Sequence, residues 1–379
     1  MKKILLITTA FALFFTSFGN ATNKLPSKRA IIKSMTRVCN WQLTNLKFEY
    51  KRKDGKIDRV PNTDWVRGAF LTGLMAQFYT TKQEAYLDSA VAICQRNNWK
   101  CGKRPRHADD LTVGQTYIEL YILKNDPVML ADVKNRVDAI VANPKRGPIT
   151  GWKNDDNWAW CDALFMAPPV FSRLYAVTQN TAYLDTMDVL WTDTYNLLYD
   201  KSEKLFYRDT RFMAKADGSQ QLSKNGKKIF WGRGNGWVMG GLVRILQNMP
   251  ENYPARSKYE QIFKDMCEKI ASVQGKDGLW RSSLLDPDEY PSPETSGSGF
   301  FCYALAWGIN NHLLPADKYL PAVINAWKGL NWAVDKKTGM LGWVQAVGAD
   351  PRSVSADETQ EYGAGAFLLA GSEVIKLAK

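Results

Sequence analysis

The sequence predicts an all-α protein in which about six helical hairpins form a closed double ring. Apolar residues recur at helical spacing in about twelve segments, whereas long segments of alternating β-branched residues are scarce. A phrase of Gly, Trp and Asp also recurs before successive helices. An open helical array is the alternative. Trp and Gly at the same end of each unit favour a ring around one shared pocket.

The helical segments follow one another along the chain. The first is an amphipathic segment, 27–44, and the later ones repeat apolar residues three or four positions apart. We expect helices at 65–80, 85–97, 112–123, 128–142, 163–178, 182–198, 236–247, 259–273, 299–310, 319–331 and 363–377. Short strand-like segments such as 205–209 are expected to form hairpins in the loops.

The recurring phrase is a loop that leads into a helix rich in Gly, Ala and aromatic residues. It occurs at 63–68, 160–162, 231–237 and 296–300, with a fifth copy at 361–365. Small residues at these positions allow the inner helices of a double ring to pack closely. The loops then carry polar and aromatic groups at one end of the ring.

The first 21 residues have the pattern of a secretory signal peptide. Lys2 and Lys3 precede a short apolar run, and small residues lead to Ala21, after which we expect cleavage. The run is too short to serve as a membrane anchor. We therefore expect an exported protein, periplasmic or secreted. No Ser/Pro-rich linker divides residues 22–379, so we expect one domain there.

The charge of the chain indicates an acidic partner. The formal net charge is +12, and removing Lys2 and Lys3 leaves +10. Nucleic acid is one acidic partner, but no Lys/Arg run or recognised binding motif supports it. An acidic polysaccharide is the other candidate for an exported basic protein.

The sequence predicts no metal and no cofactor. Only two histidines occur, there is no Cys-x-x-Cys pair, and a P-loop and a Gly-x-Ser-x-Gly elbow are both lacking. The six cysteines are an even number, which permits disulfides in an exported protein. Cys94 and Cys101 are spaced to close a short loop, although the pairing cannot be read from the sequence.

One carboxylate stands in the middle of an apolar, aromatic segment, 157–169. Burial there would desolvate Asp162 and raise its pKa, which is what a general acid needs near neutral pH. The alternative is that Asp162 caps the helix that follows. Both interpretations stay open on this segment alone.

A second acidic pair, Asp109 and Asp110, precedes another helix. Such pairs are often helix caps and dipole partners. If Asp110 met Asp162 in the pocket, the like charge would raise one pKa further.

Tryptophan is abundant, with 14 in 379 residues, and many stand in the loops. Aromatic rings above carboxylates are typical of a sugar site, because the rings cover the apolar face of the sugar. Any single Trp is more often a core residue, so the cluster carries the argument. Its members are Trp65, Trp152, Trp158, Trp160, Trp231, Trp237, Trp280 and Trp343.

Four phrases together resemble glycoside hydrolase family 105, the unsaturated rhamnogalacturonyl and glucuronyl hydrolases related to family 88. They are the segment 157–169, Ala-Asp-Asp-x-x-Val-Gly-Gln at 108–115, Trp-x-Arg-Gly-Asn-Gly-Trp at 231–237 and Pro-Glu-Thr-Ser-Gly-Ser at 293–298. The resemblance covers nearly all of residues 22–379. It implies an (α/α)6 barrel that forms a single catalytic domain.

The resemblance also implies an unusual reaction. The substrate is an oligosaccharide left by a polysaccharide lyase, with a 4,5-unsaturated uronic acid at its non-reducing end. The enzyme protonates C4 and adds water at C5, and the hemiketal opens and releases the next sugar. The resemblance assigns the acid to Asp162 and an essential partner role to Asp110. Asp109 is a further candidate, because the alignment could shift by one position.

The resemblance adds candidate substrate-binding residues. Arg233 suits a uronate carboxylate, although a structural tie to backbone carbonyls is an equal alternative. For the Thr and Ser residues, helix capping is the alternative. The set is Asp109, Trp160, Arg208, Trp231, Arg233, Trp237, Thr295, Ser296 and Ser298. At Arg208 many family members carry a His, and this departure leaves the adjoining sugar open.

Three other functions are kept as alternatives. An inverting glycosidase on saturated sugars would use Asp110 and Asp162 as acid and base. A glycan-binding protein would use the Trp-rich pocket without turnover. A polysaccharide lyase is disfavoured, because no clear Tyr/His base is found.

Overall fold

The computed structural model describes residues 24–51, 57–144 and 158–379. This part of the chain contains twelve helices of 11 to 17 residues and two helices of four residues. The long ones are α1 (Lys28–Thr44), α2 (Trp65–Thr81), α3 (Glu84–Gln95), α5 (Gly114–Lys124), α6 (Val128–Ala142), α8 (Pro168–Thr178), α9 (Ala182–Leu198), α10 (Gly232–Leu246), α11 (Arg256–Ser272), α12 (Thr295–Asn310), α13 (Ala316–Trp332) and α14 (Glu361–Leu377). The predicted all-α class is confirmed, and each of the twelve predicted segments overlaps one of these long helices.

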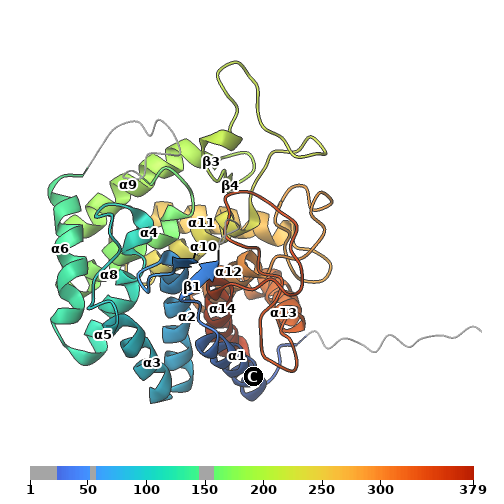
Figure 1. Cartoon of the computed structure of the whole chain (residues 1–379). Helices are drawn as coiled ribbons and strands as arrows, with labels where there is room; N and C mark the ends of the chain where they lie inside the picture. Colours follow the sequence, from blue (N-terminus) through green and yellow to red (C-terminus); the bar gives the residue numbers. More distant parts are fainter. Residues whose placement is uncertain (1–23, 52–56, 145–157) are drawn as a thin grey trace, which may run out of the picture.

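The long helices form two concentric rings. The inner ring is α2, α5, α8, α10, α12 and α14, in which each helix packs on the next and α14 closes the ring against α2. The outer ring is α3, α6, α9, α11, α13 and α1, and each outer helix packs on the inner helix beside it (Figure 1). The architecture is therefore the predicted (α/α)6 barrel rather than an open array.

Burial separates the two rings. Every residue of α10 is buried, and so is every residue of α12 except Asn310. Outer helices bury one face only, as in α11, where the buried residues recur every three or four positions. The inner helices thus form the core of the barrel.

Glycine allows the inner helices to approach closely. A Cβ on Gly73 of α2 would lie 2.5 Å from the carbonyl oxygen of Gly365 in α14. A Cβ on Gly365 would lie 2.5 Å from the carbonyl oxygen of Ala69. No side chain fits between these backbones, which explains the small residues of the recurring phrase.

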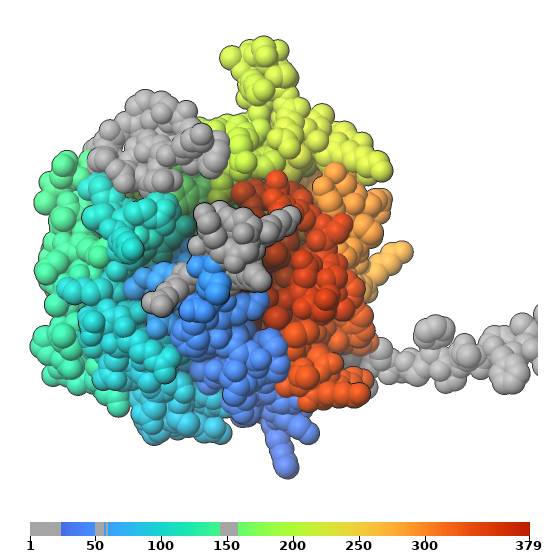
Figure 2. Space-filling model, viewed as in Figure 1, coloured from blue at the N-terminus to red at the C-terminus, as the bar shows by residue number. Residues whose placement is uncertain are grey.

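Short strands and a 3-10 turn lie at the ends of the barrel. The strands β1 (Glu49–Lys51) and β2 (Ile57–Arg59) pair antiparallel, as do β3 (Tyr199–Asp200) and β4 (Leu205–Phe206). The second pair confirms the hairpin expected near residue 205. A 3-10 turn, η1 (Thr210–Phe212), follows it, and the segment between β4 and α10 projects beyond the body of the molecule (Figure 2).

Three inner helices begin earlier than predicted, and one predicted helix is divided. Helices α10, α12 and α14 include the Gly- and Ser-rich residues that were expected to stand in loops. Tertiary packing overrides the low helix propensity of these residues. The segment 163–178 is divided into α7 (Ala163–Met166) and α8, because Pro168 has no N–H to continue the first helix.

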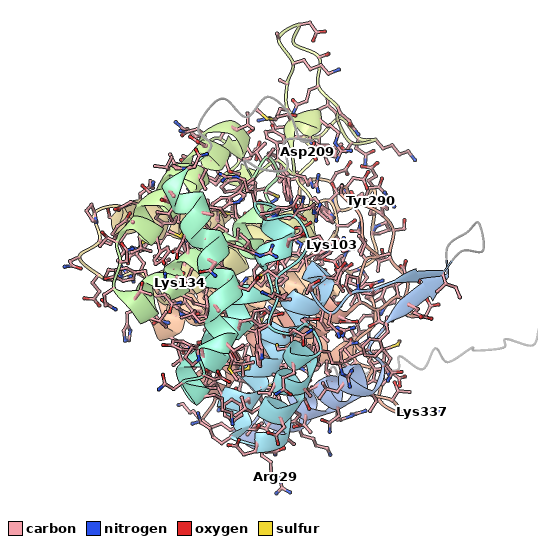
Figure 3. All side chains as sticks on the ribbon, turned by 60° about the vertical axis from the view of Figure 1, so that its left-hand side comes forward. Arg29, Lys103, Lys134, Asp209, Tyr290 and Lys337 are labelled. Carbon is pink, nitrogen blue, oxygen red and sulfur yellow. The ribbon has the colours of Figure 1, made fainter. Side chains whose placement is uncertain are left out.

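Asp209, in the loop after β4, lies at one end of the barrel, and Arg29, near the start of outer helix α1, lies at the other (Figure 3). The inner helices start at the Asp209 end. No helix in the described ranges is long and apolar enough to cross a membrane.

All six cysteines lie in the described ranges, and all six are free and buried. The disulfides that the even number permits are therefore not formed, including the one considered between Cys94 and Cys101. Burial raises the pKa of both of these thiols, so they are held protonated.

Candidate active site

A pocket of about 210 Å3 opens where inner helices begin. It brings together two carboxylates, one guanidinium and three indole rings. Its lining residues are Trp65, Asp109, Trp160, Asp162, Met166, Arg208, Trp231, Val347 and Gly348. The combination of flat apolar rings and convergent charges is what a charged sugar requires.

Asp162 lies on this pocket and is nine-tenths buried. It occupies the position before α7, but its side chain makes no capping hydrogen bond. The helix-capping alternative is therefore wrong for its carboxylate. Burial raises the pKa of Asp162, while the guanidinium groups of Arg208 and Arg233 oppose that rise.

Asp109 shares the pocket with Asp162, and it comes from α4 (Ala108–Leu111). Its side chain is 22 % exposed. Burial, followed by the negative charge of Asp162, raises the pKa of Asp109 to about 7. Two carboxylates in one pocket with raised pKa values titrate as a coupled pair, which can hold one proton near neutral pH.

Asp110 does not line the pocket, and this corrects its predicted place beside Asp162. Its carboxylate accepts hydrogen bonds from the Arg104 backbone N–H at 2.6 Å and from Arg104 Nη2 at 2.7 Å. Its backbone carbonyl accepts from the N–H of Gly102. Neighbouring residues on a helix point about 100° apart, so only one of the two acids can face the pocket. Asp110 instead fixes the loop before α4.

Arg208 bridges two carboxylates at the wall of the pocket. Its Nε lies 3.3 Å from Asp162 Oδ2, and its Nη1 donates to Asp209 Oδ2 at 2.8 Å. Asp209 is fully buried and also accepts from Arg211, which keeps the pKa of Asp209 low. Arg208 Nε is buried and makes no hydrogen bond among the described residues, so its contact with Asp162 is an ion pair only. Arg208 is therefore fixed at one side and can receive an anion at the other.

Arg233 and Trp237 lie beneath the pocket, not on it. Arg233 is fully buried between the rings of Trp231 and Tyr362, and it donates to the backbone carbonyls of Gln345 and Ala346 at 2.5 and 3.0 Å. The expectation that it binds substrate directly is wrong, and the structural alternative holds. Trp237 is fully buried against Phe165 and Phe300. Helix α10 starts four positions before the predicted helix 236–247, so it includes Arg233, whereas Trp237 was already inside the predicted range.

Thr295, Ser296 and Ser298 are fully buried in the first turn of α12, so their predicted contact with substrate is also wrong. The Thr295 hydroxyl donates to the carbonyls of Gly342 and Trp343, and the Ser296 hydroxyl donates to Glu294 Oε1. The Ser298 hydroxyl donates to the Glu294 carbonyl and accepts from the Trp280 N–H. The carboxylate of Glu294 caps the helix through the N–H groups of Ser296 and Gly297. The phrase therefore anchors the start of an inner helix.

Trp160 and Trp231 both line the pocket as predicted. Trp231 is held by a hydrogen bond from its Nε1 to Gln345 Oε1 at 3.0 Å. Trp160 packs against the ring of His107, whose Nδ1 accepts from the Asp109 backbone N–H at 3.2 Å. Of the other tryptophans in the loop cluster, Trp65 lines the pocket, Trp158 and Trp280 are core residues, and Trp152 is outside the described residues.

Sequence reasoning missed several residues of this site. Val347 and Gly348 line the pocket, and no motif marked them. Met166 also lines it and stands in the segment 157–169, but it was not named as a site residue. Val347 is 54 % exposed, and an apolar side chain at the rim of a pocket carries no pattern in a single sequence. His107 was noted only as one of two histidines. Its position two residues before Asp109 was the feature of the sequence that could have identified it as a neighbour of the site.

The described ranges contain no group of three or more His, Cys, Asp or Glu side chains placed to hold a metal ion. The pocket residues can thus exchange protons, bind an anion and stack on a sugar ring.

Comparison with known proteins agrees with this chemistry. An "Unsaturated 3S-rhamnoglycuronyl hydrolase" of Formosa agariphila is 46 % identical over 323 residues, which cover 83 % of this chain and 85 % of that protein. A solved structure described as "Glycosyl hydrolase family 88 from Bacteroides vulgatus" is 31 % identical with a TM-score of 0.81, covering 93 % of this chain and 99 % of that one. Another, described as a polysaccharide lyase, is 30 % identical with the same TM-score, covering 92 % and 98 %.

More distant structures share the fold. Two described as possible members of family 105, from Salmonella enterica and Klebsiella pneumoniae, have TM-scores of 0.75 and 0.77 at 17 % and 15 % identity, covering 97 % and 98 % of this chain and 100 % of each of theirs. The sequence profile of Glycosyl Hydrolase Family 88 matches residues 34–378. The chain is an enzyme that belongs to glycosyl hydrolase family 88, the relative of family 105 to which its motifs pointed.

Proposed function

We propose that this enzyme removes a 4,5-unsaturated uronic acid from the non-reducing end of oligosaccharides by hydrating the C4=C5 enol ether. The observation that carries the proposal is the carboxylate pair Asp109 and Asp162, held beside Arg208 in a pocket with three indole rings. The pair supplies an acid and a base, and the arginine supplies a partner for the uronate carboxylate.

The reaction needs one proton delivered to C4 and one taken from water. A carboxyl group of the pair donates its proton to C4, and the hydroxyl of water bonds to C5 as a carboxylate accepts the remaining proton. The resulting hemiketal opens and releases the next sugar. The anomeric carbon is not attacked, so the carboxylate spacing of ordinary glycosidases does not govern the outcome.

We assign the proton-transfer roles to Asp162 and Asp109. Asp162 has a buried, apolar setting, and Asp109 replaces Asp110 as its partner because Asp109 faces the same pocket. Arg208 is assigned to the uronate carboxylate, the role that Arg233 cannot fill from its buried position. Trp160 and Trp231 are assigned to the faces of the sugar.

For the adjoining sugar we propose a 3S-rhamnose. The relative that shares 46 % identity over most of both chains bears that group in its name. The test compares kcat/KM on two unsaturated disaccharides that differ only in the 3S group. A value at least about 10-fold higher on the disaccharide that carries the 3S group would support the assignment.

One assay separates this function from its alternatives. The absorbance of the enol ether is followed while the protein acts on an unsaturated disaccharide, on its saturated counterpart and on the parent polymer. Loss of absorbance on the first substrate alone supports hydration. Sugar release from the saturated compound would indicate an inverting glycosidase, a rise in absorbance on the polymer would indicate a lyase, and binding without turnover would indicate a glycan-binding protein.

We also propose that the enzyme is exported after cleavage of residues 1–21, which lie outside the described residues. The apolar run after Lys2 and Lys3 supports this. The mass of the protein recovered from the periplasm or the medium should start at Thr22. A cytoplasmic protein that retains Met1 to Ala21 would refute export.

A further inference from the structure

A second cavity lies where the inner helices end, away from the pocket at their starts. Its volume is about 540 Å3, against about 210 Å3 for the candidate active site. All six inner helices contribute to its wall, through Tyr79, Glu119, Arg173, Arg244, Tyr303 and Glu373. No residue of this cavity is shared with the pocket of Asp109 and Asp162.

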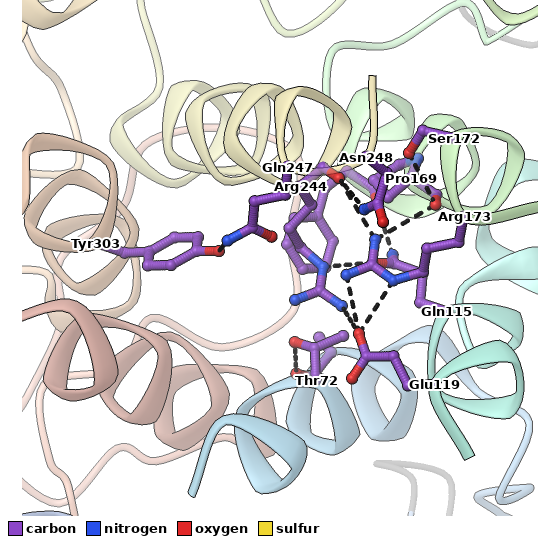
Figure 4. A network of polar contacts seen from close by, with 12 residues as sticks. Thr72, Gln115, Glu119, Pro169, Ser172, Arg173, Arg244, Gln247, Asn248 and Tyr303 are labelled. Carbon is purple, nitrogen blue, oxygen red and sulfur yellow. Dashed lines mark hydrogen bonds and ion pairs between the residues drawn. The ribbon is translucent and has the colours of Figure 1, made fainter. Parts of the chain in front are cut away.

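Two buried arginines converge on one carboxylate oxygen in this cavity (Figure 4). Arg173 Nη2 and Arg244 Nη2 each lie 2.8 Å from Glu119 Oε1. Arg244 Nε donates to Gln115 Oε1 at 2.6 Å, which ties α10 to α5. Burial, followed by the charge of Arg244, lowers the pKa of Arg173 to about 10, and Arg173 is therefore still charged at neutral pH.

The buried charges do not balance. Arg173 and Arg244 carry two positive charges against one negative charge on Glu119, and Glu373 is already paired with Lys376 at 2.6 Å. The ends of the six inner helices add partial negative charge that offsets part of this excess. A buried excess cation is costly unless an anion or water meets it.

Several polar atoms in the wall of the second cavity are available for hydrogen bonds to a ligand. Within the described residues, Arg244 Nη1, Glu119 Oε2 and Gln247 Oε1 have no hydrogen-bond partner, although all three side chains line the cavity. The Tyr303 hydroxyl accepts from Gln247 Nε2 at 3.3 Å and keeps its own proton to donate. Donors and acceptors thus alternate beside tyrosine rings and apolar residues such as Leu369, which is the lining that a polyhydroxylated ligand requires.

We propose that this cavity is a second binding site, for a sugar acid of monosaccharide size. The carboxylate of the ligand meets Arg244 Nη1, and its hydroxyl groups meet Glu119 Oε2, Gln247 Oε1 and the Tyr303 hydroxyl. A purely structural role explains how Arg173 and Arg244 tie α5, α8 and α10 together. It does not explain why hydrogen-bond donors and acceptors without a protein partner both face a cavity large enough for such a ligand.

The test is calorimetric titration of D-glucuronate into the full chain. Trp160→Ala removes a wall of the active-site pocket, so binding that persists in this variant belongs elsewhere. Adding Ala76→Phe, whose ring would fill the second cavity, should then weaken binding at least about 10-fold, whereas Ala131→Phe on the exposed face of α6 should not. Tyr303→Phe, which keeps the shape of the wall, should weaken it about 3- to 10-fold.

The ligand class is tested in the same titration. D-glucose should bind at least about 10-fold more weakly than D-glucuronate, because it lacks the charge. Inorganic sulfate should also bind more weakly, because it lacks the hydroxyl groups. Loss of all binding in Trp160→Ala, unchanged binding in both Ala76→Phe and Tyr303→Phe, or equal binding of glucose or sulfate would each overturn the proposal. None of these outcomes depends on the reaction at Asp162.

Discussion

Asp162 Oδ2 lies 3.3 Å from Arg208 Nε, and the same guanidinium is held from behind by Asp209. A positive charge at this distance favours the ionised form of Asp162, whereas burial favours its protonated form. Asp109, on the same pocket, feels only the weaker opposing charge of Arg104 and has a pKa of about 7. The two carboxylates therefore titrate as a coupled pair, and binding of a substrate carboxylate to Arg208 would weaken the charge that favours the ionised form of Asp162.

The first prediction separates the adjacent acids of α4. Asp109→Asn and Asp162→Asn should each lower kcat by at least about 100-fold, because each removes a proton-transfer group. Asp110→Asn is the matched control and should lower kcat less than about 10-fold, because its carboxylate holds Arg104 outside the pocket. Steady-state kinetics on an unsaturated disaccharide measures all three. A larger loss from Asp110→Asn than from Asp109→Asn would restore the assignment made from the sequence.

The second prediction concerns stability and pH. The pKa of Asp109 is about 7 in the folded protein and near 3.8 without its surroundings, so the folded state binds more protons between these values. Its contribution to the free energy of unfolding therefore falls as pH rises from about 4 to about 7. The Asn side chain of the Asp109→Asn variant cannot ionise, so this variant does not lose that part of the free energy of unfolding as pH rises. Its advantage over the natural protein should be absent near pH 4 and grow with pH to at most about 4 kcal/mol above pH 7.

Chemical denaturation at a series of pH values measures that difference. A constant difference across the range would show that Asp109 titrates normally in the folded protein.

The third prediction concerns recognition of the uronate carboxylate. Arg208→Ala should lower kcat/KM on unsaturated uronates by about 10- to 100-fold, the value of a charge-assisted hydrogen bond, and by less on their methyl esters. Arg211→Ala is the control, because Arg211 also binds Asp209 but does not line the pocket. Equal losses on the acid and the ester in Arg208→Ala would assign Arg208 to positioning Asp162 alone.

The fourth prediction concerns Arg233. Arg233 is fully buried and donates two hydrogen bonds, to the carbonyls of Gln345 and Ala346, so Arg233→Met should lower the free energy of unfolding by about 2–4 kcal/mol. The ratio of kcat/KM between acid and ester should stay unchanged in this variant. A selective loss on the acid would show that Arg233 contacts the substrate after all.

The order of elements was readable from the sequence because helical periodicity is strong over segments of 11 residues or more. The orientation of single side chains was not. Asp109 and Asp110 have the same charge and are adjacent, and only the direction in which α4 leaves its loop decides which of them meets Asp162. Arg233, Ser296 and Ser298 were expected in loops because Gly and Ser disfavour helices, but close packing of the inner ring draws them into helix starts.

The stereochemistry of proton addition at C4 tests the account most directly. The reaction is run in deuterated water, and early product is analysed by NMR, with the exchange at C4 of isolated product measured separately as a control. Hydration by a carboxyl group of Asp109 or Asp162 should place deuterium on one face of C4, at the rate of sugar release. Deuterium on both faces, as solvent would deliver it after cleavage at C1, or equal turnover of the saturated counterpart would contradict enol-ether hydration in this pocket.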